Sequence, residues 1–184
     1  MFQYPQNHGN KIYLRPGEVY IADKPAIVWT LLGSCVSVTF FNPRLKIGAI
    51  THAQLPGANH GSGKCHEACP VKCMHDAPRT CNTKYVNCSI EHLLREYGKR
   101  GIGGDEIKVR LYGGASIFDL PGDILAIGRK NIDMAEAILK KNNLPLYYRQ
   151  TGGKRGLSLL FQTDTGEVTI KDSQKINPGF PPSP

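Results

Sequence analysis

Two residues in the N-terminal part of the chain, Cys35 and His52, could together carry out nucleophilic chemistry. They flank a turn signal at residues 42–45 (NPRL), which separates two strand-like runs. If that turn is a two-residue hairpin loop, Cys35 and His52 face each other on one side of a sheet, with Cβ atoms roughly 4.5 to 5.5 Å apart. A thiol has an ordinary pKa of about 8.5, and an imidazole this close can accept its proton. The spacing therefore predicts a thiol nucleophile with a histidine base.

This prediction depends on the strand register. A slip of two residues would make Cys35 and His52 diagonal neighbours, whereas a slip of one would put them on opposite faces. Gly33 and Ser34 come just before the cysteine and could offer backbone N–H groups to an oxyanion. Residue types alone also allow a second interpretation, in which the cysteine is a small buried apolar residue and the histidine is simply hydrogen-bonded in place.

Short motifs in a fixed order favour the chemical interpretation. They are residues 32–38 (LGSCVSV), 42–43 (NP), 48–49 (GA), 51–56 (THAQLP), 113–118 (GGASIF), 127–128 (IG) with Asn131, and 151–153 (TGG). Each glycine pair alone is a weak signal, but the ordered set resembles the bacterial chemoreceptor glutamine deamidases, the CheD family. The resemblance covers roughly residues 17–171 and leaves out an internal tract and both ends.

The resemblance implies a cytoplasmic cysteine hydrolase, a protein-glutamine glutaminase. Such an enzyme converts particular glutamines of methyl-accepting chemotaxis receptors to glutamate and releases ammonia through a cysteine thioester. Cys35 matches the nucleophile of the family and His52 its base. The family's third catalytic residue, a threonine, falls on Trp29, so its neighbour Thr30 becomes the candidate. Adjacent strand residues point to opposite faces, so we expect Thr30 to reach the histidine only through a bulge or a local shift.

The elements that must position these residues alternate between strand and helix. Strands are predicted at 36–41, 47–55, 107–112, 146–150, 157–163 and 167–171, and helices at 86–97 and 128–142. This order predicts a mixed α/β fold, and the resemblance adds that the layers run helix, sheet, sheet, helix. The Gly113-Gly114 pair and Asn131 are interpreted as architectural, the glycines allowing a tight backbone passage near the site.

A tract at about residues 57–83 interrupts this pattern and reads as a long surface insertion. Thiols and imidazoles at such density suit zinc or an iron–sulfur cluster, but the spacing lacks paired CxxC motifs and Pro70 discourages a helix that would align the thiols. Metal binding and a flexible loop of surface thiols therefore both remain open. The candidate ligands are Cys65, Cys69, Cys73 and Cys81. Catalysis itself is expected to need no cofactor.

Length and composition fit a single domain at residues 1–176, followed by a disordered tail at 177–184. The absence of a secretory signal and of any apolar run near ~20 residues predicts a cytoplasmic protein that does not insert into a membrane. The net charge of +8 indicates an anionic partner, and charge alone does not choose among nucleic acid, a membrane face and an acidic protein. Two alternatives to the enzyme remain: an adaptor of weak activity that binds receptors or a CheC-type phosphatase, and a metal-stabilised nucleic-acid-binding module. Scattered basic residues argue against the second, so no nucleic acid is expected.

Overall fold

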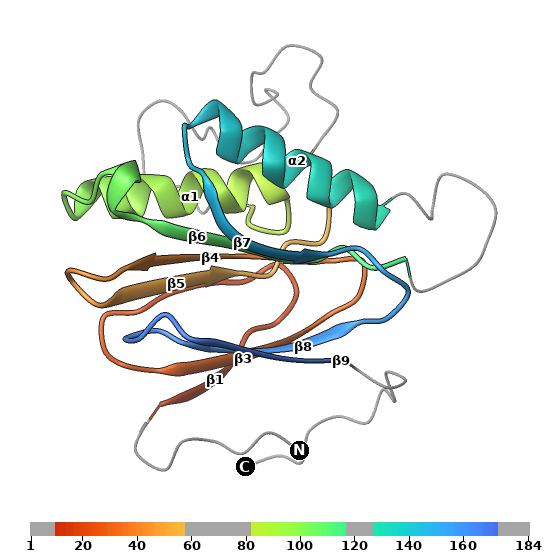
Figure 1. The fold of residues 1–184 in the computed structure, drawn as a ribbon, viewed down its shortest axis with the longest axis horizontal. Helices are drawn as coiled ribbons and strands as arrows, with labels where there is room; N and C mark the ends of the chain where they lie inside the picture. Colours follow the sequence, from red (N-terminus) through yellow and green to blue (C-terminus); the bar gives the residue numbers. More distant parts are fainter. Residues whose placement is uncertain (1–9, 58–81, 117–126, 173–184) are drawn as a thin grey trace.

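Two mixed β-sheets face each other, and helices cover one of them (Figure 1). This computed structural model describes residues 10–57, 82–116 and 127–172. The four-stranded sheet has the order β1 (Lys11–Tyr13), β3 (Ile27–Leu32), β8 (Leu157–Gln162) and β9 (Val168–Asp172). The five-stranded sheet has the order β2 (Val19–Ile21), β5 (Ile47–Thr51), β4 (Val36–Asn42), β6 (Lys108–Gly113) and β7 (Leu146–Thr151).

Strand β4 lies at the centre of the five-stranded sheet and is buried along its whole length. Its side chains alternate between two apolar environments. Val36, Val38 and Phe40 belong to the core beneath the helices. The intervening residues therefore face the other sheet, as do Ile50 of β5 and Tyr112 of β6, which belong to the core between the sheets. The residues around Cys35 are thus placed at the end of the most buried strand of the five-stranded sheet.

Helices α1 (Val86–Lys99) and α2 (Ile127–Lys141) both pack on the outer face of the five-stranded sheet (Figure 1). In α1 the buried residues recur at helical spacing, and the last of them, Tyr97, donates from its hydroxyl to the carbonyl oxygens of Phe40 at 3.1 Å and Ile47 at 3.0 Å. The hydroxyl ties the helix to both strands of the β4–β5 hairpin. Among the described residues, no helix in this structure is long and apolar enough to cross a bilayer.

The predicted α/β class with mixed sheets is confirmed. The layering expected from the resemblance had a helix layer on each outer face, whereas the described residues place both helices on one sheet and none on the other. Three strands, β1, β2 and β3, were not anticipated as separate elements. The first two have only three residues each, and β3, apolar except for Thr30, reads in sequence as the start of the run that becomes β4.

The β4–β5 turn differs from the expected two-residue loop. Asn42 pairs with Ile47, so four residues form the loop and the expected register is wrong by two positions. The side chain of Asn42 is the cause: its Oδ1 accepts the backbone N–H of Leu45 at 2.8 Å and closes a local turn that competes with the shorter loop. Lys46 completes the loop with a positive φ of 53°.

Candidate active site

His52 follows the last residue of β5, and both its backbone and its ring are hydrogen-bonded. Its N–H donates to the carbonyl oxygen of Glu18 at 2.9 Å, and its own carbonyl oxygen accepts the N–H of Gly17 at 2.7 Å. The alternation along β5 turns the side chain toward the space between the sheets, where it is buried. Backbone bonds from the segment before β2 therefore fix where the imidazole enters the interior.

Thr30, on the facing sheet, contacts the imidazole directly. Its Oγ1 lies 2.7 Å from Nδ1 of His52 and donates to the carbonyl oxygen of Leu14 at 2.8 Å. Since the hydroxyl proton of Thr30 is used toward Leu14, the hydroxyl oxygen accepts from Nδ1–H of the histidine. The Leu14 carbonyl oxygen also lies 3.4 Å from Nδ1, and a carbonyl can only accept. The proton of the neutral ring therefore resides on Nδ1, and Nε2 carries a free lone pair.

Nε2 of His52 is buried and has no hydrogen-bond partner among the described residues. An unpaired buried acceptor costs free energy, and such groups in native structures commonly mark functional positions. Burial lowers the pKa of His52 to about 4, opposed by the backbone carbonyl of Leu14 and by the negative charge of Glu18. The ring is thus neutral at physiological pH, with one nitrogen available as a base.

Thr30 reaches His52 without the bulge expected from the sequence. Strand β3 pairs regularly with β8 throughout, Trp29 opposite Leu160 and Thr30 opposite Leu159. The inward face of β3 belongs to Val28, Thr30 and Leu32, so Thr30 points into the sandwich by ordinary alternation. Trp29 points outward instead, and its ring lies 4.3 Å from that of Tyr13, centroid to centroid. Of the two neighbouring candidates, the structure brings only Thr30 to the histidine.

Cys35 lies one position before β4. The register continues through an isolated bridge between Val36 and Ala53, so Cys35 and His52 are diagonal neighbours on the same face, with Cβ atoms roughly 7 Å apart rather than directly opposite. The thiol is half-buried and packs against the core between the sheets. Burial raises the pKa of the Cys35 thiol, partly opposed by its own backbone N–H. Both groups are therefore neutral at rest.

Three successive carbonyl oxygens anchor the segment that carries the thiol. Those of Gly33 and Cys35 accept the N–H groups of Ala115 at 2.9 Å and Gly114 at 2.8 Å, and that of Ser34 accepts a side-chain N–H from α2. Gly113 and Gly114, with φ of 93° and 73°, make the approach possible. A Cβ on Gly113 would overlap the Cys35 carbonyl oxygen. The architectural role expected for the glycine pair is therefore confirmed in atomic detail.

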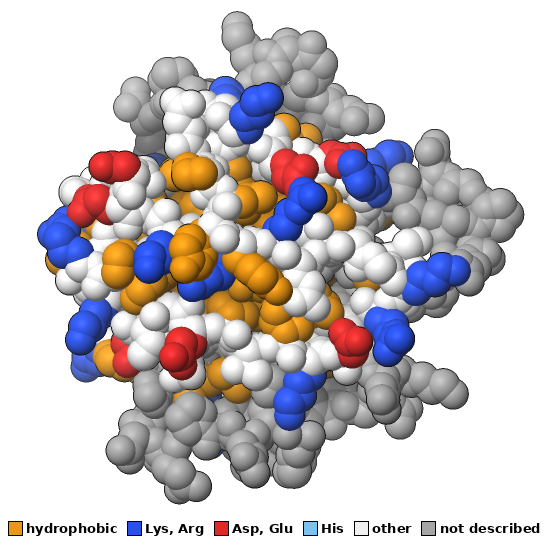
Figure 2. Space-filling view, in the orientation of Figure 1, with side chains coloured by type: hydrophobic (Ala, Val, Ile, Leu, Met, Phe, Trp, Pro, Cys, Tyr) orange, Lys and Arg blue, Asp and Glu red, His pale blue; other side chains and the backbone are white. Residues whose placement is uncertain are grey.

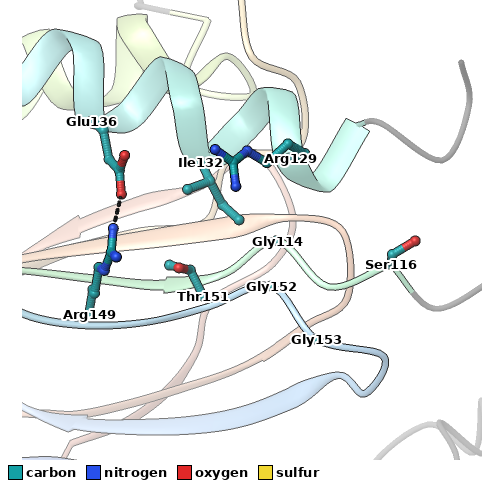
Figure 3. Close-up of a pocket in the computed structure, with 9 residues that line it drawn as sticks. All are labelled: Gly114, Ser116, Arg129, Ile132, Glu136, Arg149, Thr151, Gly152 and Gly153. Carbon is teal, nitrogen blue, oxygen red and sulfur yellow. Dashed lines mark hydrogen bonds and ion pairs between the residues drawn. The ribbon is translucent and has the colours of Figure 1, made fainter.

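A cavity of about 400 Å³ lies on the other side of these glycines, between α2 and the ends of β6 and β7 (Figure 3). An ion pair between Glu136 and Arg149, at 2.8 Å, lies at one end of it. Gly114 lines the cavity, but neither Cys35 nor His52 does. The cavity opens on the helix side of the sheet, whereas the thiol and the imidazole face the second sheet, so we do not assign the cavity to the chemistry of that pair.

The proposed metal ligands Cys65, Cys69, Cys73 and Cys81 lie outside the described residues. In the part of the chain that the structure describes, no group of three or more His, Cys, Asp or Glu side chains could hold a metal ion.

Sequence reasoning missed one participant of the site, the carbonyl oxygen of Leu14. A main-chain acceptor has no residue-type signature, and the contact requires β1 and β3 to lie side by side in parallel.

The fold and site together define an α/β sandwich protein in which a thiol and an imidazole share one sheet face, and a hydroxyl of the facing sheet contacts the imidazole. Comparison with known proteins agrees with this class. Residues 70–172 match the family model described as CheD chemotactic sensory transduction, a match that begins after Cys35 and His52.

Curated relatives cover most of the chain. One from Geobacter sulfurreducens, named probable chemoreceptor glutamine deamidase CheD 2, is 36% identical over 87% of this chain and 88% of its own length. Proteins named probable chemoreceptor glutamine deamidase CheD from Maridesulfovibrio salexigens and Thermococcus kodakarensis are 34% and 30% identical, over 93% and 84% of this chain and 98% and 88% of their own lengths. The chain belongs to the CheD family, which confirms the resemblance drawn from its motifs.

The lowered pKa of His52 predicts how stability changes in acid. The folded state binds the proton only below about pH 4, whereas the unfolded state binds it below about pH 6.5. The unfolded state therefore holds more protons between these values, and the free energy of unfolding falls as pH drops through this window, by about 3 kcal/mol in all. Above pH 6.5 the lowered pKa of His52 no longer reduces the free energy of unfolding.

Urea unfolding at pH 7.5 and pH 5 checks this expectation. His52→Gln, which does not titrate in this range, should lose less stability between the two pH values than the wild-type protein. Equal losses in both proteins would show that the imidazole is not held neutral by burial.

Proposed function

We propose that this chain is an enzyme that deamidates glutamine side chains of chemoreceptors, with Cys35 as nucleophile, His52 as base and Thr30 as the residue that orients the base. One observation carries the proposal. The hydrogen-bond chain from Thr30 and Leu14 to Nδ1 leaves the buried Nε2 of His52 as a free base, on the sheet face that also bears the Cys35 thiol. The names of the curated relatives supply the substrate class.

The two pKa shifts favour general-base catalysis over a resting ion pair. Burial raises the pKa of the thiol and lowers that of the imidazole, so the proton remains on sulfur until attack begins. Nε2 of His52 then accepts the proton as Sγ of Cys35 bonds to the carboxamide carbon. The positive charge that forms on the ring is stabilised by Thr30 and Leu14, both of which accept from Nδ1–H.

The remaining steps balance with water as the only co-reactant. The imidazolium gives its proton to the amide nitrogen, the C–N bond breaks and ammonia leaves, so that a thioester remains on Cys35. His52 then takes a proton from water, whose oxygen attacks the thioester carbon. The C–S bond breaks, the thiolate recovers its proton from His52, and the product acid gives its remaining proton to solvent and leaves as the glutamyl carboxylate. The roles of Cys35 and His52 follow from the hydrogen bonds of the imidazole and from the burial of both groups. Backbone N–H groups near the thiol stabilise the oxyanion.

The surface is compatible with an acidic protein partner. The chain carries a net charge of +8, and on the face shown in Figure 2 Lys and Arg side chains are spread around a central hydrophobic area. Spread positive charge steers acidic partners without defining a nucleic-acid stripe. Binding of a CheC-type phosphatase, and a cytoplasmic location, stay predictions that rest on the family resemblance.

Substitution of the thiol tests the activity. A purified cytoplasmic fragment of a chemoreceptor from the source organism is incubated with each protein, and its peptides are analysed by mass spectrometry for conversion of glutamine to glutamate. Wild-type protein should convert specific glutamines, and Cys35→Ala should convert none. Cys88→Ala is the matched control, because Cys88 is the other cysteine of the described residues and is buried in α1. Conversion that survives in folded Cys35→Ala would rule out the thioester route.

Substitution at the neighbouring positions 29 and 30 tests which residue orients the base. Thr30→Val keeps the shape of the buried side chain and removes its hydroxyl, so kcat should fall roughly 10- to 100-fold while the fold is kept. Thr30→Ser should recover most of the rate because it restores the hydroxyl. Trp29→Phe, on the outer face, should leave kcat within about twofold. A larger loss from Trp29→Phe than from Thr30→Val would reverse the assignment.

A further inference from the structure

Asn131 is a buried side chain whose contacts the reaction scheme above does not use. It lies on the inner face of α2, fully buried. Its Nδ2 donates both hydrogens to main-chain oxygens, to Ser34 at 2.9 Å and to Gln54 at 3.0 Å. One acceptor directly precedes the nucleophile and the other follows His52 by two residues. A single amide group thus joins the two segments that carry the reacting side chains.

The two contacts of Asn131 lie where the β4–β5 ladder ends. The ladder between β4 and β5 ends with the bonded pair Val36 and Ala53. In an antiparallel ladder the next bonded pair would be Ser34 with Leu55, but the N–H of Leu55 donates to the carbonyl oxygen of Lys84 instead. Ends of strands fray unless other partners satisfy their backbone groups. The amide of Asn131 supplies that missing connection from the side of the helix layer.

The bond to Ser34 also orients the peptide group that links Ser34 to Cys35. In a trans peptide the C=O and the following N–H point in opposite directions. Because the Ser34 oxygen points toward α2, the Cys35 N–H points away from it, toward the face that bears the thiol. This N–H also lies within hydrogen-bonding range of its own Sγ, which lowers the pKa of the Cys35 thiol against the effect of burial.

We infer that Asn131 is a positioning residue that holds the Cys35 N–H as a donor to the oxyanion of the tetrahedral intermediate. This inference rests on the proposed function and adds to it the group that binds the developing charge. A donor aimed in advance acts only where charge forms, so its loss lowers kcat much more than it changes KM. The close packing of α2 keeps this donor in a fixed direction. A Cβ on Gly114 would lie 2.8 Å from the Gly128 carbonyl oxygen, so the helix packs tightly against the residue whose N–H binds the Cys35 carbonyl oxygen.

Asn131→Asp and Asn131→Ala test the inference, with Asn142→Ala as control one residue beyond the end of the same helix. Asn142 also donates from its side chain to a main-chain oxygen, but at the exposed C-terminal end. We expect both position-131 variants to lose at least about tenfold in kcat toward the receptor fragment, with KM within about twofold. The rate at which iodoacetamide alkylates Cys35 should stay within about twofold of the wild-type rate, because this reaction passes through no oxyanion.

Two results would overturn the inference in variants shown to be folded by their melting temperature. One is a kcat within about threefold of wild type. The other is an alkylation rate that falls in parallel with kcat, because Asn131 would then act on the thiol or on the fold as a whole. Inactivity of the wild-type protein would instead contradict the proposed function. An equal loss of activity in Asn142→Ala would also overturn the inference, because the effect would then not be specific to position 131.

A second measurement needs no variant. A peptide whose glutamine is replaced by the corresponding aldehyde should form a hemithioacetal with the thiol of the wild-type protein. Its oxygen occupies the place of the oxyanion, so the amide proton of Cys35 should move downfield in the nuclear magnetic resonance spectrum. An unchanged Cys35 amide shift with the aldehyde bound would overturn the inference.

Discussion

The hydrogen bond between Thr30 and His52 links the two sheets across the interior of the sandwich, and the site depends on it. Thr30 belongs to the four-stranded sheet and His52 to the end of the five-stranded one, so the bond forms only when both sheets are folded and packed. Its 2.7 Å length and the use of the hydroxyl proton toward Leu14 decide where the ring proton resides. A contact that belongs to neither sheet alone thereby sets the chemistry of the histidine.

The thiol is held by a different set of constraints, all of them on the main chain. Three consecutive carbonyl oxygens from Gly33 to Cys35 are anchored by the two residues that follow β6 and by α2. That arrangement needs close backbone approach, which only glycine permits at positions 113 and 114. The imidazole is therefore positioned by the four-stranded sheet, whereas the thiol is positioned from the helix side of the five-stranded sheet. Their relative placement reflects the packing of the whole sandwich rather than one local motif.

Much of the fold follows from sequence because strand and helix periodicities are clear in the second half of the chain, where α1, β6, α2, β7, β8 and β9 were all anticipated. The β4–β5 register was not predicted correctly, because the Asn42 side chain closes a four-residue loop whose sequence resembles that of a two-residue loop. The face of Cys35 and His52 was nevertheless correct, because a shift of two residues preserves the alternation.

The role of Thr30 illustrates the limit of motif matching. The family position fell on Trp29, and only the pairing of β3 with β8 shows which neighbour faces inward. Asn131 was interpreted as architectural, and its two bonds agree with that, but the identity of the acceptors could not be read from sequence. They lie 97 and 77 residues away, on segments brought together only by the packed sheet and helix.

The contacts of Thr30 and Leu14 fix the imidazole of His52 as the Nδ1–H tautomer, with Nε2 as the free base. Nuclear magnetic resonance of the ¹⁵N-labelled ring of His52 at neutral pH measures this directly. The account predicts a protonated nitrogen at Nδ1 and an unprotonated one at Nε2, and collapse of this pattern toward a tautomer mixture in Thr30→Val. A proton on Nε2 in the wild-type protein would contradict the account, because the nitrogen assigned to accept the thiol proton would already carry one.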